Sequence, residues 1–283
     1  MPILKDKVAV ITGGSRGLGL GIAEAFAREG AAVVIASRSQ TAVDVAVQGL
    51  KAQGRQATGI ACDVSNLGQV EAVAALALST FGRLDVWVNN AGLLAPFGPT
   101  AHVPSDAFQS VIDTNIIGVY NGSVTALRHF VPQRSGKLIN VLGRGDDGPV
   151  PLHNAYGSSK RWVRTFTSAM AREYADSGVG VYAFNPGLVT TDMVSQVPSV
   201  AGFESKLSSL RTVVRLLANP PEVPAARALW IASAATDGRT DLNVQVLTPT
   251  FLVGRLVRAA WRWVTRQQEP EPPMNIETVK SVI

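Results

Sequence analysis

The stretch VAVITGGSRGLG, residues 8–19, decides the fold. Its first four residues are apolar without alternation, which is typical of a strand buried on both faces of a parallel sheet. A glycine-rich turn and a helix-like segment, residues 20–28, follow. Such a turn lets the backbone approach phosphate groups, and the helix N-terminus adds free N–H groups and a positive dipole. The stretch therefore predicts a diphosphate-binding turn, with an ordinary strand-to-helix turn as the alternative. The residues expected to bind there are Gly13, Ser15, Arg16, Gly17, Leu18 and Gly19.

Further apolar runs continue this alternation of strands and helices along the chain. The alternation predicts an α/β fold, a single-domain doubly wound parallel sheet of the Rossmann type over residues 1–250. Residues 192–221 contain no evident strand and are expected to form a mobile lid over the site, a kind of element that often carries substrate selectivity. The strands are expected at residues 31–37, 57–62, 84–88, 137–142, 179–185 and 242–247.

The composition of the 283 residues limits the class of protein. Hydrophobic residues make up 46% and charged residues 17%, which supports a large core and excludes global disorder. The single cysteine, Cys62, excludes an internal disulfide and fits a reducing compartment. No apolar run is long enough to cross a bilayer. We therefore expect a soluble, cytoplasmic protein, or at most one that associates peripherally with a membrane.

The end of the second expected strand bears on cofactor choice. An NAD-specific site would have an acidic residue there to bind the ribose 2′-hydroxyl. This chain has Ser37 and Arg38 instead, and a guanidinium suits a 2′-phosphate. Arg16, in the glycine turn, could reach the same group. The pair favours NADPH, although either arginine alone could be a solvated surface residue.

Several polar or glycine-containing turns follow the expected strands directly. In doubly wound sheets a ligand binds at the carboxyl ends of the strands, so these turns should meet at one site. We expect the cofactor-binding residues to extend along that edge. They are Asp63, Val64, Asn90, Ala91, Gly92, Pro186, Gly187, Val189 and Thr191, and Gly143 lies at the same edge.

Tyr156 and Lys160 are four residues apart in a helical segment, so they lie on one helix face. An adjacent cation should favour the phenolate and lower the tyrosine pKa. The lysine could also hold a cofactor ribose. Asn115 is a polar amide within an apolar helical pattern and must be hydrogen-bonded, either to a neighbouring carbonyl or to a water beside the lysine.

Much of the net charge of +5 lies near the C-terminus. Residues 251–266 contain four arginines and no acid, so the rest of the chain is near neutral and a nucleic-acid surface is not expected. The spacing of leucines and tryptophan predicts a basic amphipathic helix, followed by a link and a short tail up to residue 283. Such a helix suits an anionic membrane surface. Packing on the same domain or on a partner subunit is the alternative.

Taken together, these motifs resemble the short-chain dehydrogenase/reductase family over roughly residues 5–250. The resemblance implies that Tyr156 is a general acid, Lys160 its tuning cation and ribose contact, and Asn115 a support for proton relay. It also implies that Asp63 binds adenine and that Val189 and Thr191 bind the nicotinamide carboxamide. A homodimer or homotetramer is expected on the same ground. The matching motifs are Thr12-Gly13-x-x-x-Gly17-Leu18-Gly19, Asp63-Val64, Asn89-Asn90-Ala91-Gly92, Asn115, Tyr156-x-x-x-Lys160 and Pro186-Gly187-x-Val189-x-Thr191.

The chain departs from the family pattern at Gly143. The family has a serine thirteen positions before the tyrosine, where it bonds the substrate oxygen, and glycine stands there in this sequence. A glycine leaves room for a bulky substrate. A narrower similarity, carried by residues 243–249 and the basic segment that follows, is to chlorophyll b reductases, which also depart from the serine and reduce a formyl group on a large tetrapyrrole.

These observations predict an NADPH-dependent carbonyl reductase that transfers hydride to an aldehyde or ketone, with no metal site. The alternative is a non-catalytic NADPH-binding protein, because of Gly143.

Overall fold

The computed structural model describes residues 2–248, 254, 261, 265 and 275–283. Within them, a seven-stranded sheet has the strand order β3-β2-β1-β4-β5-β6-β8, and every neighbouring pair is parallel. The chain therefore runs outward from β1 to one edge and then crosses to β4 and outward again, as the doubly wound prediction requires. The strands are β1 Val8–Thr12, β2 Ala32–Ser37, β3 Ala57–Ala61, β4 Val86–Asn89, β5 Gly136–Val141, β6 Val179–Asn185 and β8 Leu242–Gln245.

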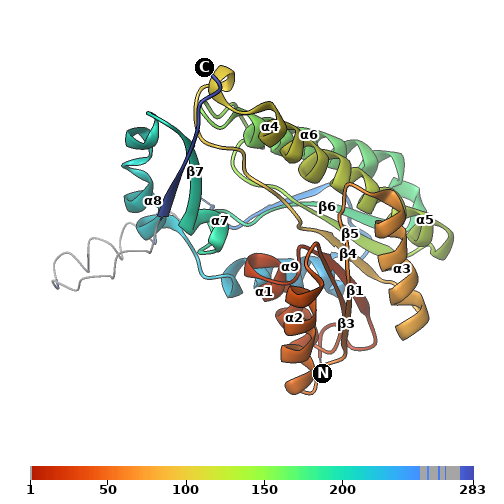
Figure 1. The fold of residues 1–283 in the computed structure, drawn as a ribbon. Coiled ribbons are helices and arrows are strands. Elements are labelled where there is room, and N and C mark those ends of the chain that lie inside the picture. Colours follow the sequence, from red (N-terminus) through yellow and green to blue (C-terminus); the bar gives the residue numbers. More distant parts are fainter. Residues whose placement is uncertain (1, 249–253, 255–260, 262–264, 266–274) are drawn as a thin grey trace.

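Helices cover both faces of this sheet (Figure 1). Alternate residues of β1 face opposite layers, because successive side chains of a strand point to opposite sides. Ala9 and Ile11 pack with α1, α2 and α9, whereas Val8 and Val10 pack with α3, α5 and α6. The helices are α1 Gly17–Arg28, α2 Gln40–Ala52, α3 Leu67–Phe81, α4 Ser105–Ile112, α5 Gly118–Gln133, α6 Asn154–Glu173, α7 Asp192–Ser195, α8 Leu210–Leu217 and α9 Glu222–Ala232.

The apolar helical pattern around Asn115 is not one continuous α-helix. Between α4 and α5, Asp113–Ile117 forms a π-helical turn that contains the buried Asn115. Such a turn carries one more residue than an α-helical turn and is common at functional sites. The side-chain amide of Asn115 is therefore buried where the π-helical turn separates α4 from α5.

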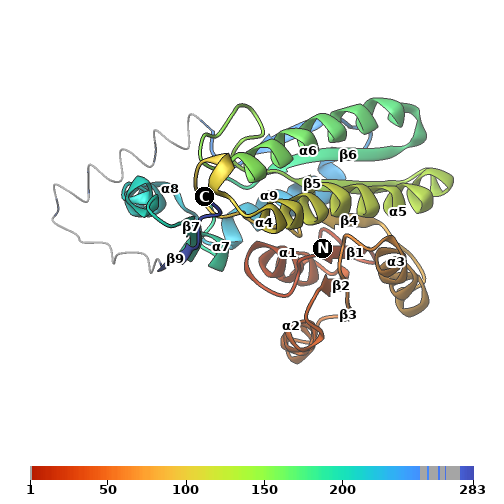
Figure 2. The same ribbon diagram turned by 45° about the horizontal axis from the view of Figure 1, so that its top comes forward.

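Residues 192–221, the segment expected to form a lid, contain a strand, so the expectation that no strand lies there was wrong. Strand β7, Gln196–Val200, lies within residues 192–221 and pairs in parallel with β9, Asn275–Val279. The two strands lie side by side (Figures 1 and 2). Proline is disfavoured inside strands, so Pro198 hides β7 in the sequence pattern. The partner strand β9 is also distant in sequence, so no local pattern predicts the pair. The predicted basic helix over residues 251–266 lies outside the described residues, apart from three isolated positions.

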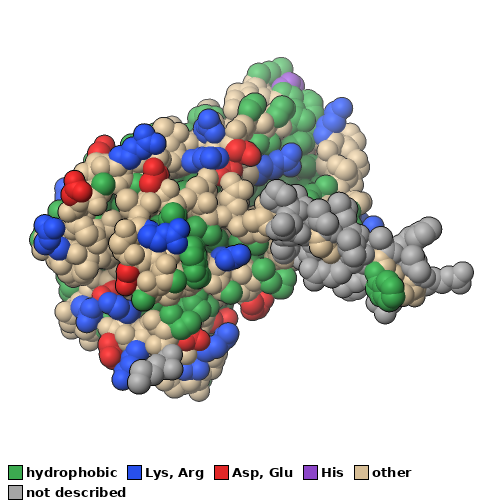
Figure 3. Space-filling model, turned by 180° about the vertical axis from the view of Figure 1, so that it is seen from behind, with side chains coloured by type: hydrophobic (Ala, Val, Ile, Leu, Met, Phe, Trp, Pro, Cys, Tyr) green, Lys and Arg blue, Asp and Glu red, His purple; other side chains and the backbone are tan. Residues whose placement is uncertain are grey.

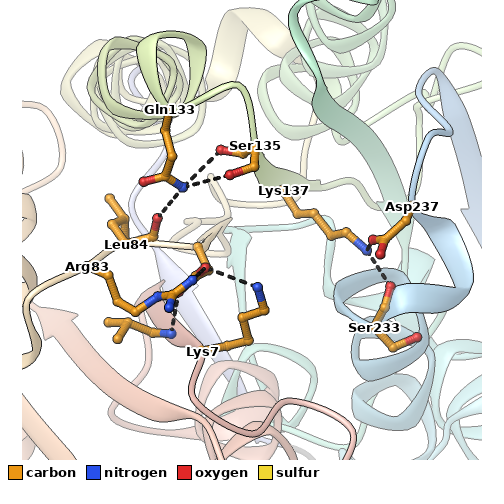
Figure 4. Close-up of polar contacts among 10 residues, drawn as sticks. Lys7, Arg83, Leu84, Gln133, Ser135, Lys137, Ser233 and Asp237 are labelled. Atoms are coloured by element: carbon orange, nitrogen blue, oxygen red, sulfur yellow. Dashed lines mark hydrogen bonds and ion pairs between the residues drawn. The ribbon is translucent and has the colours of Figure 1, made fainter.

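Polar contacts fix the amino ends of the strands (Figure 4). Asp85, just before β4, accepts hydrogen bonds from the backbone N–H of Val8 at 2.9 Å and from Arg83 Nη2 at 2.7 Å. Lys137 in β5 forms an ion pair with Asp237 at 2.8 Å. These contacts stabilise the amino ends of the strands. The glycine turn lies at the opposite, carboxyl ends, where ligands bind in doubly wound sheets.

Charged side chains of both signs are interspersed on the face shown in Figure 3. This face is not a continuous basic surface, in keeping with the near-neutral body read from the sequence.

Candidate active site

The glycine turn has the conformation expected of a phosphate cradle. Gly13 and Gly17 have φ angles of +63° and +54°, which disfavour other residues. A Cβ added at Gly19 would overlap the carbonyl oxygen of Gly13. Arg16 occupies the N-cap position of α1, and its side chain makes no hydrogen bond to the first turn of the helix. The first backbone N–H groups of α1 therefore stay available to an anion. Ser15 and Leu18 complete this turn, and its shape fits a diphosphate.

Asn90 holds the turn from the neighbouring strand. Its Nδ2 donates to the carbonyl oxygens of Thr12 at 2.9 Å and Gly13 at 3.2 Å. The backbone N–H groups of Asn90 and Ala91 both donate to Thr12 Oγ1. Asn90 and Ala91 therefore shape the cradle, and the motif after β4 has a structural role at the site.

The two arginines expected at the ribose have different surroundings. Arg38 is exposed at the end of β2 and has no hydrogen bond or ion pair within the described residues. Arg16 Nη1 instead binds Asp192 Oδ2 at 3.1 Å, with both side chains mostly exposed. Arg38 is thus the freer guanidinium, and Arg16 links the glycine turn to the start of α7.

Asp63 and Val64 follow β3 at the same edge of the sheet. Asp63 Oδ1 accepts hydrogen bonds from the backbone N–H and the hydroxyl of Ser65 at 2.9 and 2.7 Å. The carbonyl oxygen of Val64 accepts from Asn121 Nδ2 at 2.9 Å. Both residues are therefore held in place, and Asp63 Oδ2 accepts no hydrogen bond from the described residues.

The turn after β6 closes the site from the other side. It begins at Pro186, and Gly187 has a φ of +70° and donates its N–H to Asn185 Oδ1 at 2.9 Å. Val189 is buried and forms an isolated bridge with Asn219. A Cβ added at Gly17 would lie 3.1 Å from Thr191 Cγ2. The structure thus brings the last predicted cofactor motif against the glycine turn.

Asn115 is fully hydrogen-bonded, as its burial requires. Its Oδ1 accepts from the backbone N–H of Leu93 at 2.8 Å, and its Nδ2 donates to Leu93 O at 3.0 Å and Ser159 Oγ at 3.1 Å. The amide therefore pairs with a neighbouring backbone, one of the two partners considered for it. A Cβ added at Gly92 would lie 3.5 Å from Asn115 Oδ1 and 3.8 Å from Lys160 Nζ, so these three residues are adjacent.

Tyr156 and Lys160 lie on one face of α6, as predicted. Lys160 Nζ is 5.5 Å from the centre of the Tyr156 ring and donates to Val141 O at 3.0 Å. The expectation that the pKa of Tyr156 is lowered was wrong. Burial, aided by the charge of Asp146, raises the pKa of Tyr156, while burial lowers the pKa of Lys160 to about 8. Loss of hydration is the largest cause of the raised tyrosine pKa, so the phenol keeps its proton near neutral pH.

Gly143 does not provide the open space expected of it. A Cβ added there would overlap the Tyr156 hydroxyl and lie 3.1 Å from Tyr156 Cζ. The loop after β5 presses closely on α6, since a Cβ at Gly145 would meet Gly157 Cα at 2.4 Å. The missing side chain lets the phenol lie against the loop, rather than admitting a bulky substrate.

Two residues of the site were missed by the sequence reading. Asp146 is 2% exposed, accepts a hydrogen bond from Asn185 Nδ2 at 3.1 Å, and its pKa is raised by burial. His153 stacks on Tyr156 with ring centres 5.2 Å apart and planes at 22°. Burial, aided by the charge of Arg144, lowers the His153 pKa to about 4, so the ring is neutral. The position of His153, three residues before Tyr156, could have indicated that the two rings are neighbours. Asp146 lies in a loop sequence that gives no sign of its burial.

Two other kinds of site find no support in the described residues. In the part of the chain that the structure describes, no group of three or more His, Cys, Asp or Glu side chains could hold a metal ion. Among the described helices, none is long and apolar enough to cross a membrane.

Comparisons with known proteins identify a family and several relatives. The family model described as short chain dehydrogenase matches residues 7–201. The 3beta-hydroxysteroid dehydrogenase 1 of Eggerthella lenta is 34% identical over 232 residues, covering 81% of this chain and 88% of that protein. Glucose 1-dehydrogenase 2 of Bacillus subtilis is 32% identical, with 81% and 89% covered. Ketoacyl reductase HetN of Nostoc sp. is 32% identical, with 77% and 78% covered.

Proposed function

Because the chain belongs to the short-chain dehydrogenase family, we propose that it is an NADPH-dependent reductase of an aldehyde or ketone. The family is one of oxidoreductases that use a nicotinamide dinucleotide and act on CH–OH or C=O groups. One observation carries the proposal. Tyr156, Lys160 and Asn115 meet beside Gly92, at the edge of the sheet where the glycine turn opens.

The chain's own groups suit proton transfer to a carbonyl oxygen. Bound NADPH supplies the hydride. Tyr156 donates its hydroxyl proton to the oxygen that becomes an alcohol, and its raised pKa keeps that proton in place until transfer. Lys160, with a pKa of about 8, is mostly charged near neutral pH and stabilises the resulting phenolate. Asn115 holds the backbone of Leu93 and the hydroxyl of Ser159, and so fixes the floor of the site.

Arg38 supports NADPH rather than NADH. It stands at the end of β2, where an acid would bind the 2′-hydroxyl of NADH, and it is exposed with no partner in the described residues. A 2′-phosphate would give this guanidinium a bidentate partner. Glucose 1-dehydrogenase 2 and the other relatives do not decide between the two cofactors.

The substrate proposed is large and lipophilic, with a formyl group such as that of a chlorophyll b-type tetrapyrrole. The similarity of residues 243–249 to chlorophyll b reductases supports it, as does a relative named for a hydroxysteroid, another large apolar compound. An aldehyde is easier to reduce than a ketone, which suits a site without the family serine. The tight packing at Gly143 does not add to this support.

The partners proposed are a second copy of the chain and an anionic membrane surface. A homodimer or homotetramer would cover the exposed Ile117 and Tyr120 of the π-helical turn and α5. Residues 251–266 would supply peripheral membrane contact for an otherwise cytoplasmic protein. Flotation with anionic liposomes tests the contact, and a folded full-length chain that stays unbound rejects it.

A non-catalytic NADPH-binding protein is the second candidate. Gly143 favours it, because the hydroxyl that would bond the substrate oxygen is missing and the Tyr156 hydroxyl overlaps the place of a Cβ at residue 143. Loss of one such donor costs roughly 2.7–4 kcal/mol of transition-state stabilisation. The presence of Tyr156, Lys160 and Asn115 together argues against this candidate, because a protein that only binds NADPH does not need proton-transfer residues.

The test is NADPH oxidation against a panel of aldehydes and ketones that includes formyl tetrapyrroles. Tyr156→Phe keeps the ring but removes the proton, so turnover should fall by about 10²–10⁴-fold while NADPH still binds. Tyr174→Phe, which changes a phenol at the far end of α6, is the matched control and should leave turnover unchanged. If wild type binds NADPH but reduces no carbonyl in the panel, the binding-protein candidate is favoured instead.

A further inference from the structure

We propose that the C-terminal strand β9 is a positioning element for Tyr156, acting through β7, Phe97 and His153. This inference rests on the proposed function and adds residues far from the family motifs to the same site. Each link is a contact between described residues.

The first link is the pairing of the tail with the lid. All five residues of β9 are in register with β7, from Gln196 opposite Asn275 to Val200 opposite Val279. The N–H of Ala201 donates to Val279 O at 2.9 Å. Beyond the strand, Ser281 Oγ lies 3.0 Å from His102 Nδ1. The tail is therefore bound to the lid through β9, and beyond β9 it contacts His102.

The second link joins the opposite edge of β7 to Phe97. The N–H of Phe97 donates to Pro198 O at 2.8 Å, and the N–H of Val200 donates to Phe97 O at 2.9 Å. At the next residue, a Cβ added to Gly98 would lie 2.8 Å from Val200 Cγ2, so only glycine fits there without a shift. Strand β7 thus lies between β9 and the Phe97 segment, and a shift of β7 moves both.

The third link joins Phe97 to the tyrosine. The N–H of Gly98 donates to Leu152 O at 2.8 Å, and Leu152 has a φ of +65°, a strained value for leucine that its surroundings must hold. His153 packs edge-on against Phe97 at 6.1 Å and stacks on Tyr156 at 5.2 Å. These separations lie within the range of favourable aromatic pairs.

Ring packing fixes His153 in this chain of contacts. Its Nε2 is buried and has no hydrogen-bond partner among the described residues. A side chain without such a bond depends on its neighbours for its position. Phe97 on one side and Tyr156 on the other supply that packing, so a displaced Phe97 frees the ring that supports the tyrosine.

The strand offers a matched pair of substitutions in the full-length chain. Backbone groups alternate in direction along a strand. Because Val279 O faces β7, the N–H groups of residues 277 and 279 face β7 and that of residue 278 faces away. Glu277→Pro therefore removes a bond to β7, whereas Thr278→Pro removes an outward N–H and serves as control. Thr278→Pro also removes the exposed hydrogen bond from Thr278 Oγ1 to Glu204 Oε1, and Thr278→Val, which loses only that bond, separates its effect. The side chains of both residues are exposed.

The main readout does not depend on turnover. A fluorinated tyrosine at position 156 reports its surroundings by ¹⁹F NMR, and hydrogen exchange at the Val200 N–H reports the state of β7. Glu277→Pro should speed that exchange, shift the ¹⁹F resonance and lower kcat by about tenfold or more, since a displacement of about 1 Å can cost about 100-fold. NADPH affinity should stay unchanged, and Thr278→Pro should change none of these.

A second variant tests the link from the other end. In a His153→Leu background the stack is gone, so Glu277→Pro should no longer move the ¹⁹F resonance. The proposal is overturned if Glu277→Pro speeds exchange at Val200 but leaves the resonance and kcat unchanged, if both proline variants act alike, or if His153→Leu leaves the shift intact. If wild type reduces no carbonyl, the proposed function fails and the ¹⁹F result still decides the role of β9.

Discussion

Gly143→Ala is the substitution whose effect follows most directly from the structure. The added methyl would overlap the Tyr156 hydroxyl, so either the tyrosine or the loop after β5 must move. Overpacking of this kind typically costs about 1–3 kcal/mol of folding free energy. No φ strain adds to it, because Gly143 is not among the residues with positive φ. We expect the unfolding free energy to fall by that amount.

The Tyr156→Phe background isolates the cause. Without the hydroxyl, the nearest tyrosine atom to the new methyl is Cζ at 3.1 Å, a tight contact that a shift of a few tenths of an ångström relieves. The cost of Gly143→Ala should then drop below about 1 kcal/mol, which gives a coupling energy of about 1–2 kcal/mol, well above the error of about 0.3–0.5 expected for independent sites. Gly148→Ala, at a loop glycine where an added Cβ meets nothing within 4 Å, is the control and should show no coupling.

Denaturant unfolding of the four proteins measures the cycle, and the kcat of Gly143→Ala measures the catalytic effect. A tyrosine displaced by about 1 Å should cost up to about 100-fold in kcat. Gly143→Ser should suffer the same overlap, so restoring the family side chain lowers turnover unless the phenol moves to a new position. Additive effects of Gly143→Ala and Tyr156→Phe, with no change in cost between the two backgrounds, would refute the reasoning.

The remaining predictions concern charge. Arg38→Asp should raise the KM for NADPH much more than that for NADH, and equal effects would make Arg38 a plain surface residue. Asp146→Asn removes a charge that raises the pKa of both Tyr156 and Lys160, so the alkaline limit of kcat should move to lower pH, whereas Asp147→Asn, at an exposed position, should move it less. His153 has a pKa near 4 when folded and an ordinary value of 6.5, so the unfolded chain binds more protons between them. Wild-type stability should therefore fall as the pH drops from about 6.5 to about 4, and His153→Gln should flatten that decline; an unchanged slope would show that the ring is not buried in neutral form.

Local spacing was sufficient to predict much of the fold and part of the site. The run of residues 8–19 specified a buried strand, a glycine turn and a helix, because each depends on neighbours within a few positions. The four-residue spacing of Tyr156 and Lys160 placed them on one helix face, which the structure confirms. Turns that follow strands predicted which residues meet at the carboxyl ends of the strands, since parallel strands share one direction.

The tertiary structure decided what depends on distant partners and on burial. Strand β7 exists because residues 275–279 pair with it, and nothing near Pro198 signals that partner. The spacing of Tyr156 and Lys160 suggested a lowered tyrosine pKa, but the structure buries both groups and burial reverses the shift. Gly143 appeared to be an empty position until the fold placed a phenol against it. In each case the sequence specified the side chain, while packing against segments far along the chain determined its environment and hence its chemistry.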